Sequence, residues 1–194
     1  MTKFLYVNDV IFSLGSGELT HTVGLLNALH RKGESIEFLT RVENLEILAR
    51  AGLSPDVELD VSRMGRSKVA KRVFYYLKVY VKNIRGKDFI YVRESFYSFL
   101  ILPLALMAPG KFILEFNGVR SFEVRRGFLK TVISCFNFLN KLLYRVVLTN
   151  VAVSEGVNRY LKDSWGNGRV VTINNGTALT SMADYKDISR TVGR

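Results

Sequence analysis

The sequence predicts an α/β domain with a doubly wound, Rossmann-like fold, in which helices cover both faces of a mostly parallel sheet of about seven strands. Two observations support this prediction. The chain has 194 residues, 48% of them hydrophobic, which is enough to bury the core of one domain. Short runs of β-branched and aromatic residues alternate with segments of helical periodicity, and this alternation is typical of parallel strands joined by helical crossovers.

Each expected strand is a short apolar run that ends in polar or small residues. The expected strands span residues 4–8, 36–40, 57–61, 89–93, 112–117, 151–154 and 170–173. The expected helices between and after them span residues 18–31, 43–51, 68–84, 97–107, 122–144 and 155–162. The chain turns polar after Gly176, which predicts a domain over residues 1–176 followed by a linker or tail over residues 177–194.

Cysteine, histidine and apolar content exclude several classes of protein. The single cysteine, Cys135, cannot form an intrachain disulfide, and with two histidines a Cys/His zinc module is not expected. The first apolar stretch is interrupted at Asp9, too early for a secretion signal. The longest apolar run, residues 96–108, is shorter than the roughly 20 residues that a spanning helix needs. We therefore expect a cytoplasmic protein without a membrane-spanning segment or a metal site.

The net charge of +11 is concentrated in two segments, with +9 over residues 63–93 and +5 over residues 120–145. The first segment contains an amphipathic helix whose expected apolar side consists of Val69, Val73, Leu77, Tyr80 and Ile84. Its expected charged side consists of Lys71, Lys78, Lys82 and Arg85. Such a side is either solvated or faces an anionic membrane surface. Nucleic-acid binding stays an alternative function that the cations suggest, but no nucleic-acid partner is expected, because neither stacking aromatic residues nor a helix-turn-helix pattern accompanies them.

A glycine-rich loop follows the first expected strand and opens the first helix. Its residues are Gly15, Ser16, Gly17 and Glu18. Backbone amide groups at a helix N-terminus can bind a phosphate, and glycines allow the phosphate to approach closely. The dinucleotide fingerprint is incomplete, because Thr20 stands where its third glycine belongs and the second strand ends in Thr40-Arg41 instead of an acidic residue. NAD(P) binding stays an alternative. A second alternative is that the glycines only make the loop before the helix flexible and bind no ligand.

Polar and small residues also follow the later expected strands. They are Arg93 and Glu94, Asn117 and Gly118, Ser154, and Asn175 and Gly176. Taken singly, each has an ordinary explanation, since Asn-Gly favours a turn and serine before a helix favours a cap. Ligands of doubly wound sheets bind at the carboxyl ends of the strands, so the recurrence of such residues predicts one cleft at that edge.

Several segments, in this order, resemble the N-terminal half of family 4 glycosyltransferases of the GT-B fold. They are the Gly-Ser-Gly-Glu loop, the helix that ends in Leu29-His30-Arg31-Lys32-Gly33, the strand Ile36-Glu37-Phe38-Leu39-Thr40, and the later segments 88–93, 112–118, 151–154 and 171–176. The resemblance spans nearly the whole chain. It implies the acceptor-binding half of an enzyme that transfers a sugar from a nucleotide-diphosphate sugar, the co-substrate, with no other cofactor.

The resemblance also implies partners and site residues. The partners are a sugar acceptor, of which lipid-linked molecules and polysaccharide precursors are common examples in the family, and a C-terminal donor-binding domain supplied in cis or in trans. The expected substrate-binding residues are Gly15, Ser16, Gly17, Glu18, His21, Arg93, Glu94, Asn117, Gly118, Ser154, Asn175 and Gly176. No residue is assigned as catalytic. The expected location is the cytoplasm, with peripheral attachment to the inner face of a membrane left open.

The chain departs from the family pattern at two residues. Asn117 stands where the family usually has a histidine, and Glu34 stands where a histidine usually follows the glycine. Glu115 and Glu123 have the spacing of the family's donor-site glutamates but follow a strand of this domain, so we do not assign them to that pair. A non-catalytic subunit that binds a partner transferase chain is an alternative function that fits the same sequence.

Overall fold

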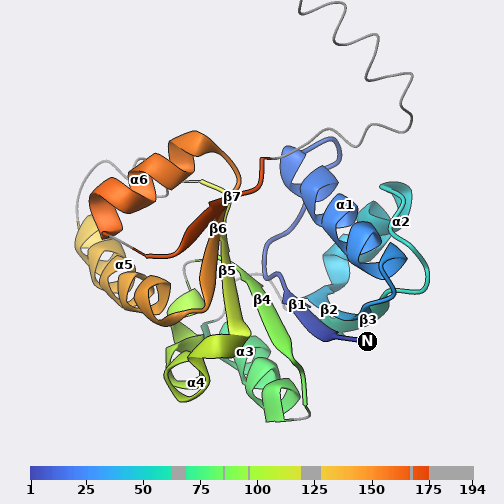
Figure 1. Ribbon diagram of the computed structural model, residues 1–194, viewed down its shortest axis with the longest axis horizontal. Coiled ribbons are helices and arrows are strands. Elements are labelled where there is room, and N and C mark those ends of the chain that lie inside the picture. Colours follow the sequence, from blue (N-terminus) through green and yellow to red (C-terminus); the bar gives the residue numbers. More distant parts are fainter. Residues whose placement is uncertain (63–68, 85, 96, 119–127, 167, 175–194) are drawn as a thin grey trace, which may run out of the picture.

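The computed structural model describes residues 1–62, 69–84, 86–95, 97–118, 128–166 and 168–174 (Figure 1). Its centre is a seven-stranded sheet in the order β3-β2-β1-β4-β5-β6-β7, and every pair of neighbouring strands is parallel. The strands are β1 Lys3–Val7, β2 Ser35–Arg41, β3 Glu58–Ser62, β4 Phe89–Arg93, β5 Phe112–Phe116, β6 Thr149–Ala152 and β7 Val170–Thr172. The prediction of a doubly wound, Rossmann-like sheet is confirmed, and the described sheet is wholly parallel.

The strand order reverses between β1 and β4. From β1 the chain adds β2 and β3 on one side, and it then returns to place β4 on the other side of β1. Tyr6 of β1 is the register partner of Phe38 on β2 and of Tyr91 on β4. Such a reversal parts the loops at the carboxyl ends of the two strands, so the β1–β4 junction is where a doubly wound sheet binds ligands.

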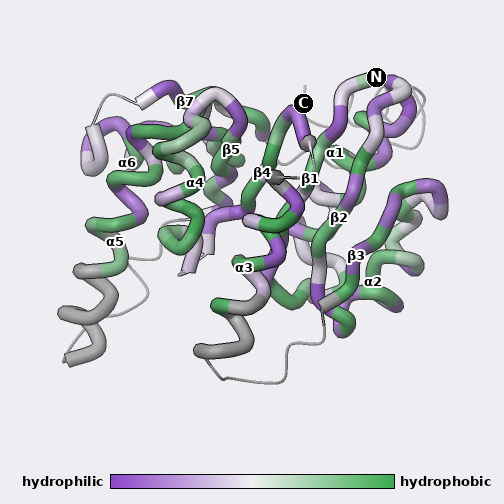
Figure 2. The backbone as a smooth tube through the Cα atoms, turned by 90° about the horizontal axis from the view of Figure 1, so that it is seen from below, coloured by the Kyte–Doolittle hydropathy of each residue, from purple (hydrophilic) through white to green (hydrophobic). Residues whose placement is uncertain are grey.

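Helices cover both faces of the sheet (Figure 1). The helices α1 (Gly17–Arg31) and α2 (Leu45–Arg50) pack on one face, against Tyr6, Phe38 and Tyr91. The opposite face is covered by α3 (Val69–Ile84), α4 (Leu102–Met107), α5 (Phe128–Val146) and α6 (Glu155–Trp165). Along the backbone, hydrophobic residues alternate with polar ones, as expected for strands and helices packed in layers (Figure 2).

The boundaries of the elements differ from the predicted ones by a few residues. Two segments predicted as single helices each begin with a 3-10 turn, Val42–Asn44 before α2 and Ser98–Ile101 before α4. A further 3-10 turn, Pro109–Lys111, precedes β5. Residues 122–127 of the predicted fifth helix and the predicted domain limit at residue 176 lie outside the described residues.

The buried side of α3 is not the predicted one. Tyr75, Tyr76 and Val79 are buried against the sheet, whereas Leu77 is 45% exposed and Val81 is 49% exposed. The assignment of Leu77 to the packed side was therefore wrong. The tyrosines can be buried because their hydroxyls find partners: Tyr75 donates to the carbonyl of Leu39 at 2.7 Å, and the Tyr76 hydroxyl lies 2.7 Å from Oγ of Ser95.

Candidate active site at the carboxyl edge of the sheet

A buried carboxylate marks the carboxyl edge of the sheet beneath the first turns of α1. The side chain of Glu115 on β5 is fully buried. It accepts hydrogen bonds from Nδ2 of Asn117 at 2.5 Å and from the Tyr6 hydroxyl at 3.4 Å. Nε2 of His21 lies 3.3 Å from Oε2 of Glu115. A carboxylate is tolerated in such a position because hydrogen-bond donors surround it.

Strand alternation and helix capping explain how these groups meet. Phe112, Leu114 and Phe116 belong to the core under α3 to α6, so Glu115 points to the other face, toward α1. The helix begins there because Oγ of Ser16 accepts a hydrogen bond from the amide of Leu19 at 3.3 Å and so caps its N-terminus. One turn further along, His21 faces the sheet.

Arg93 at the end of β4 is a second buried charge beside Glu115. It is 2% exposed, and it is the register partner of Glu115 on the neighbouring strand. Its guanidinium forms an ion pair with Glu18 at 2.8 Å, donates to Oγ1 of Thr22 at 3.3 Å and lies 5.8 Å from the centroid of the Phe12 ring. Glu18, whose side chain is 43% exposed, connects these buried groups with the solvent.

We call these residues the Glu115 cluster. Its members are Tyr6, Glu18, His21, Thr22, Arg93, Glu115 and Asn117. Burial by itself would raise the pKa of the Glu115 carboxyl, but the contact with His21, the charge of Arg93 and the hydrogen bond from Asn117 together lower this pKa below its usual value. Burial and the nearby carboxylate of Glu115 raise the pKa of the Tyr6 hydroxyl far above its usual value. Glu115 is therefore ionised and Tyr6 is neutral at physiological pH.

A second polar chain lies at the same edge, on the side of α3. The Ser95 hydroxyl donates to Oδ2 of Asp9 at 3.0 Å, and the Ser95 amide donates to Oγ of Ser98 at 2.7 Å. Tyr76 contacts the same Ser95 hydroxyl. Asp9 and Ser95 lie two residues beyond the ends of β1 and β4, so these hydrogen bonds hold together the loops on both sides of the point where the strand order reverses.

The structure brings together four of the predicted site residues. Glu18, His21, Arg93 and Asn117 all belong to the Glu115 cluster. The amide of Glu94 donates to the carbonyl of Glu115 at 2.7 Å, so Glu94 reaches the cluster through its backbone.

The other predicted site residues have different places. Ser16 and Ser154 are helix caps, and Oγ of Ser154 accepts from the amide of Val157 at 3.2 Å at the start of α6. Gly17 is the first residue of α1, as expected, and Gly118 is exposed. Gly15 has φ of 74°, a conformation that suits glycine, and lines a groove on the outer side of α1. Asn175 and Gly176 lie outside the described residues.

The structure describes the side chains of two of the four cations, in and beside α3, that were expected to face a membrane. Lys82 is 14% exposed and pairs with Glu37 of β2 and, at 2.8 Å, with Asp60 of β3. Lys78, which is 42% exposed, lies 3.2 Å from Asp60. Lys82 therefore lies on the side of α3 that packs against the sheet. Its assignment to the outward, charged side of the helix was wrong. The side chains of Lys71 and Arg85 are outside the described part of the structure.

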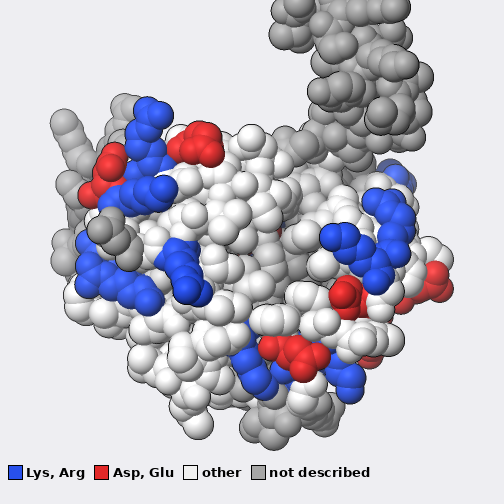
Figure 3. Space-filling view, viewed as in Figure 1, with Lys and Arg blue, Asp and Glu red and all other residues white. Residues whose placement is uncertain are grey.

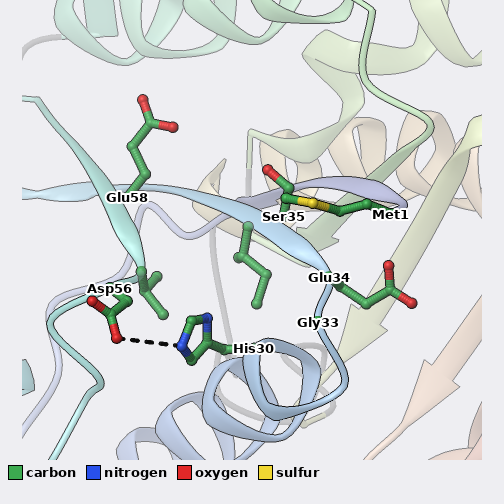
Figure 4. Close-up of a pocket in the computed structure, with 9 residues that line it drawn as sticks. Met1, His30, Gly33, Glu34, Ser35, Asp56 and Glu58 are labelled. Carbon is green, nitrogen blue, oxygen red and sulfur yellow. Dashed lines mark ion pairs between the residues drawn. The ribbon is translucent and has the colours of Figure 1, made fainter.

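A pocket of about 250 Å³ lies at the opposite, amino edge of the sheet (Figure 4). Its walls include His30 at the end of α1 together with Glu34 and Asp56, and Nε2 of His30 lies 3.5 Å from the Asp56 carboxylate. The two histidines of the chain therefore lie at opposite edges of the sheet. Since ligands of such sheets bind at the carboxyl edge, we assign the candidate site to the edge that holds His21.

Sequence reasoning missed three members of the cluster: Tyr6, Thr22 and Glu115. The signal for Glu115 was present, because a glutamate in the apolar strand Phe112–Phe116 stands at a position that faces α1. Among the described residues, no group of three or more His, Cys, Asp or Glu side chains could hold a metal ion. In the same part of the chain, no helix is long and apolar enough to span a membrane.

The fold is similar to a Rossmann-like portion, about half the length, of solved structures described as a glycosyltransferase and a sucrose-phosphate synthase. The chain superposes on a glycosyltransferase from Rickettsia africae with a TM-score of 0.56 and 15% identity, covering 99% of this chain and 49% of that one. It superposes on sucrose-phosphate synthase from Thermosynechococcus elongatus with a TM-score of 0.67 and 14% identity, covering 98% and 53%. This chain thus spans about half the length of these two structures.

A third similar structure comes from a different class of enzyme. It is described as a putative UDP-N-acetylglucosamine 2-epimerase from Listeria monocytogenes, with a TM-score of 0.56 and 12% identity, covering 86% of this chain and 43% of that one. At such identities the likeness is one of fold. No protein-family model matches the sequence. No curated protein matches it either.

Proposed function

We propose that this chain is the acceptor-binding half of a glycosyltransferase that uses a nucleotide-diphosphate sugar as donor. The observation that carries the proposal is the Glu115 cluster, because it gathers a histidine, an arginine and two carboxylates at the carboxyl edge of the sheet, at the reversal of strand order. The fold neighbours support it, since they include a glycosyltransferase and a sucrose-phosphate synthase, and the description of the third names a nucleotide sugar.

The chemistry of sugar transfer gives His21 a role in this proposal. An acceptor hydroxyl becomes a better nucleophile when a neighbouring base takes up its proton. Nε2 of His21 faces Oε2 of Glu115 at 3.3 Å, so Nδ1 is the ring atom left to take up this proton, and the carboxylate of Glu115 stabilises the cation that forms. Arg93, neutralised by Glu18, keeps the carboxylate and the first turns of α1 in place.

The donor would bind between this half and a second domain in this proposal. The nucleotide and the diphosphate of the donor then contact mainly the second domain, while the acceptor contacts the edge that holds His21 and Asn117. Both a polysaccharide precursor and a lipid-linked molecule are compatible with this proposed acceptor site. The helix α3, with its neighbouring cations, is the element that we propose approaches an anionic membrane.

A transfer assay tests the proposal. Labelled nucleotide-diphosphate sugars and glycan and lipid acceptors are incubated with the chain alone and with a donor-binding domain joined to it or added as a separate chain. We expect product only when both halves are present. In that setting His21→Ala should lower the rate about a hundredfold or more, because general-base catalysis contributes at least that factor. His30→Ala, the matched control, should leave the rate unchanged. Turnover by the chain alone, or full activity of His21→Ala, would contradict the proposal.

A further inference from the structure

Large hydrophobic side chains are exposed on the outer side of α3, α4 and α5. Met107 and Leu106 of α4 are 83% and 61% exposed, and Phe138 of α5 is 62% exposed. Leu77 and Val81, four residues apart on α3, are exposed as well, on the side away from the buried tyrosines. We call these five residues the outer apolar surface.

Half-buried hydrophobic residues connect the exposed ones. The ring of Phe99, in the 3-10 turn before α4, stacks on Phe136 of α5 with the ring centroids 4.8 Å apart. The hydroxyl of Tyr80 on α3 donates to the carbonyl of Leu100 in the same turn at 2.8 Å. The turn therefore joins α3 to α5, and α4 packs against α5 directly. Connected apolar surfaces of this kind mark sites of interaction with a protein or a membrane.

The distribution of charge indicates which kind of partner fits. Within their bounds, α3, α4 and α5 contain no Asp or Glu, whereas α1, α2 and α6 each contain at least one. The two helices beside α4 come from the two basic segments, with net charges of +9 over residues 63–93 and +5 over residues 120–145. Figure 3 shows an uncharged surface at the lower left of the view, where α4 lies in Figure 1, with Lys and Arg side chains above it over α5.

Cations whose charge is not neutralised border the outer apolar surface. Nζ of Lys111, four residues after Met107, donates to a backbone carbonyl at 3.1 Å. Nζ of Lys141 on α5 does the same at 2.9 Å, and Arg145 on the same helix is exposed. In the described part of the chain, none of these three cations forms an ion pair with a carboxylate. Each is therefore available to an anionic group outside the protein.

We propose that the outer apolar surface inserts into the interface of an anionic membrane. Met107, Leu106 and Phe138 enter the lipid, and the bordering cations contact the head groups. A second copy of this chain is disfavoured as the partner, because it would bring the same cations face to face. This inference deepens the proposed approach of α3 to a membrane by adding apolar insertion through α4 and α5. It does not depend on sugar transfer, and it leaves the Glu115 cluster, on the other face of the sheet, open to substrate.

Sedimentation with vesicles of equal parts phosphatidylglycerol and phosphatidylcholine tests the surface on the full chain. The double variant Leu106→Ser, Met107→Ser should bind the vesicles about tenfold or more weakly and should be released at lower salt than the wild type, because two apolar side chains no longer enter the lipid. Ile11→Ser, Leu14→Ser is the matched control, since these exposed residues precede α1 on the other side of the sheet. The control should bind like the wild type, and both variants should keep the wild-type Tm.

Fluorescence distinguishes insertion from a purely electrostatic approach. Phe138→Trp places an indole in the outer apolar surface, whereas Trp165, the single tryptophan of the wild type, packs against Phe116 and Tyr144. With vesicles that contain brominated phosphatidylcholine, the emission added by Phe138→Trp should be quenched and shifted to the blue, and the emission of the wild type should stay unchanged.

Three results would overturn the inference. They are an indole at position 138 that the brominated lipid does not quench, equal vesicle binding by Leu106→Ser, Met107→Ser and the wild type, and a dimer in size-exclusion chromatography that this variant dissolves although neither protein binds vesicles. The last result would assign the surface to a second copy of the chain. Because none of the substituted residues belongs to the Glu115 cluster, these outcomes are read separately from the transfer assay.

Discussion

His21 on α1 and Glu115 on β5 lie 3.3 Å apart in a part of the protein that is almost closed to solvent. They are far apart in the sequence, and the pair forms only because β5 stands beside β4 while α1 crosses the same face of the sheet. The pair therefore ties the first helix to the second half of the sheet, and it places an imidazole at the edge where ligands of such folds bind.

Replacing Glu115 should make the stability of the protein less dependent on pH in the acid range. The pKa of this carboxyl is lowered in the folded state, so its stabilising contribution is complete above the usual carboxyl pKa of about 4.3 and is lost as the pH falls through the lower folded-state value. Urea unfolding of Glu115→Gln should show a free energy about 1–3 kcal/mol lower at pH 7 and a shallower decline toward low pH.

Glu46→Gln is the matched control for this experiment. Glu46 pairs with Arg50 at the exposed surface, where such pairs contribute little. The control should therefore unfold like the wild type at both pH values. If the free energy of unfolding of Glu115→Gln declined toward low pH as steeply as that of the wild type, the carboxyl of Glu115 would not be held in its charged form.

The sheet and the carboxyl edge that holds the candidate site could be predicted because local patterns encode them. The loop at Gly17 stands where a helix begins, and Arg93 and the Asn117-Gly118 turn stand where strands end. Parallel strands share one carboxyl edge, so Glu18, Arg93 and Asn117 had to meet there. The partner of His21 could not be identified in this way, because Glu115 lies within a strand and only the strand order places it under α1.

The orientation of α3 about its own axis, which decides which residues it buries, is a second feature that the sequence pattern could not predict. Hydropathy along a helical wheel ranks Leu77 above Tyr75 and Tyr76, and it places lysine on the outer side. In the structure, the tyrosine hydroxyls find buried partners and Lys82 finds the carboxylates of Glu37 and Asp60, so these residues turn inward. The carboxylates on β2 and β3 that decide this rotation are far away in the sequence.

Lys82 and Lys78 should therefore differ in their effect on stability, although they are neighbours on one helix. Lys82→Ala removes an ion-pair partner of Asp60 at a position that is largely shielded from water. We therefore expect the free energy of unfolding, measured in urea, to fall by about 3 kcal/mol. Lys78→Ala should cost less than about 1 kcal/mol, since its side chain is 42% exposed. Equal effects of the two variants would contradict the inward position of Lys82.

Association of α3 with an anionic membrane should be tested without touching Lys82. The double variant Lys71→Glu, Lys78→Glu should reduce sedimentation with anionic liposomes at low salt, because charges near such a surface contribute about 1 kcal/mol each. Rising salt should release the wild-type protein through screening. If the double variant bound as well as the wild type, or if neutral liposomes bound the protein equally well, membrane association of α3 would be contradicted and its charged side would simply be solvated.

Ser154 should behave as a cap rather than as a substrate ligand. Its hydroxyl accepts the amide of Val157 at the start of α6, so Ser154→Ala should lower the free energy of unfolding by about 1 kcal/mol. Ser154→Asp should restore stability, because aspartate caps helices as well as serine does. If the alanine variant were as stable as the wild type, the hydroxyl would have to be assigned another role.

The most direct test of the acceptor-binding role is NMR chemical-shift mapping of the full chain with glycan and lipid-linked acceptors. We expect the largest perturbations at the carboxyl edge, in the imidazole of His21 and the amides of Glu18 and Asn117, while His30 at the amino edge stays unperturbed. Nucleotide-diphosphate sugar added alone should shift few signals, because most of its proposed contacts belong to a second domain. Perturbations confined to the surroundings of His30, or none with any acceptor, would contradict the account.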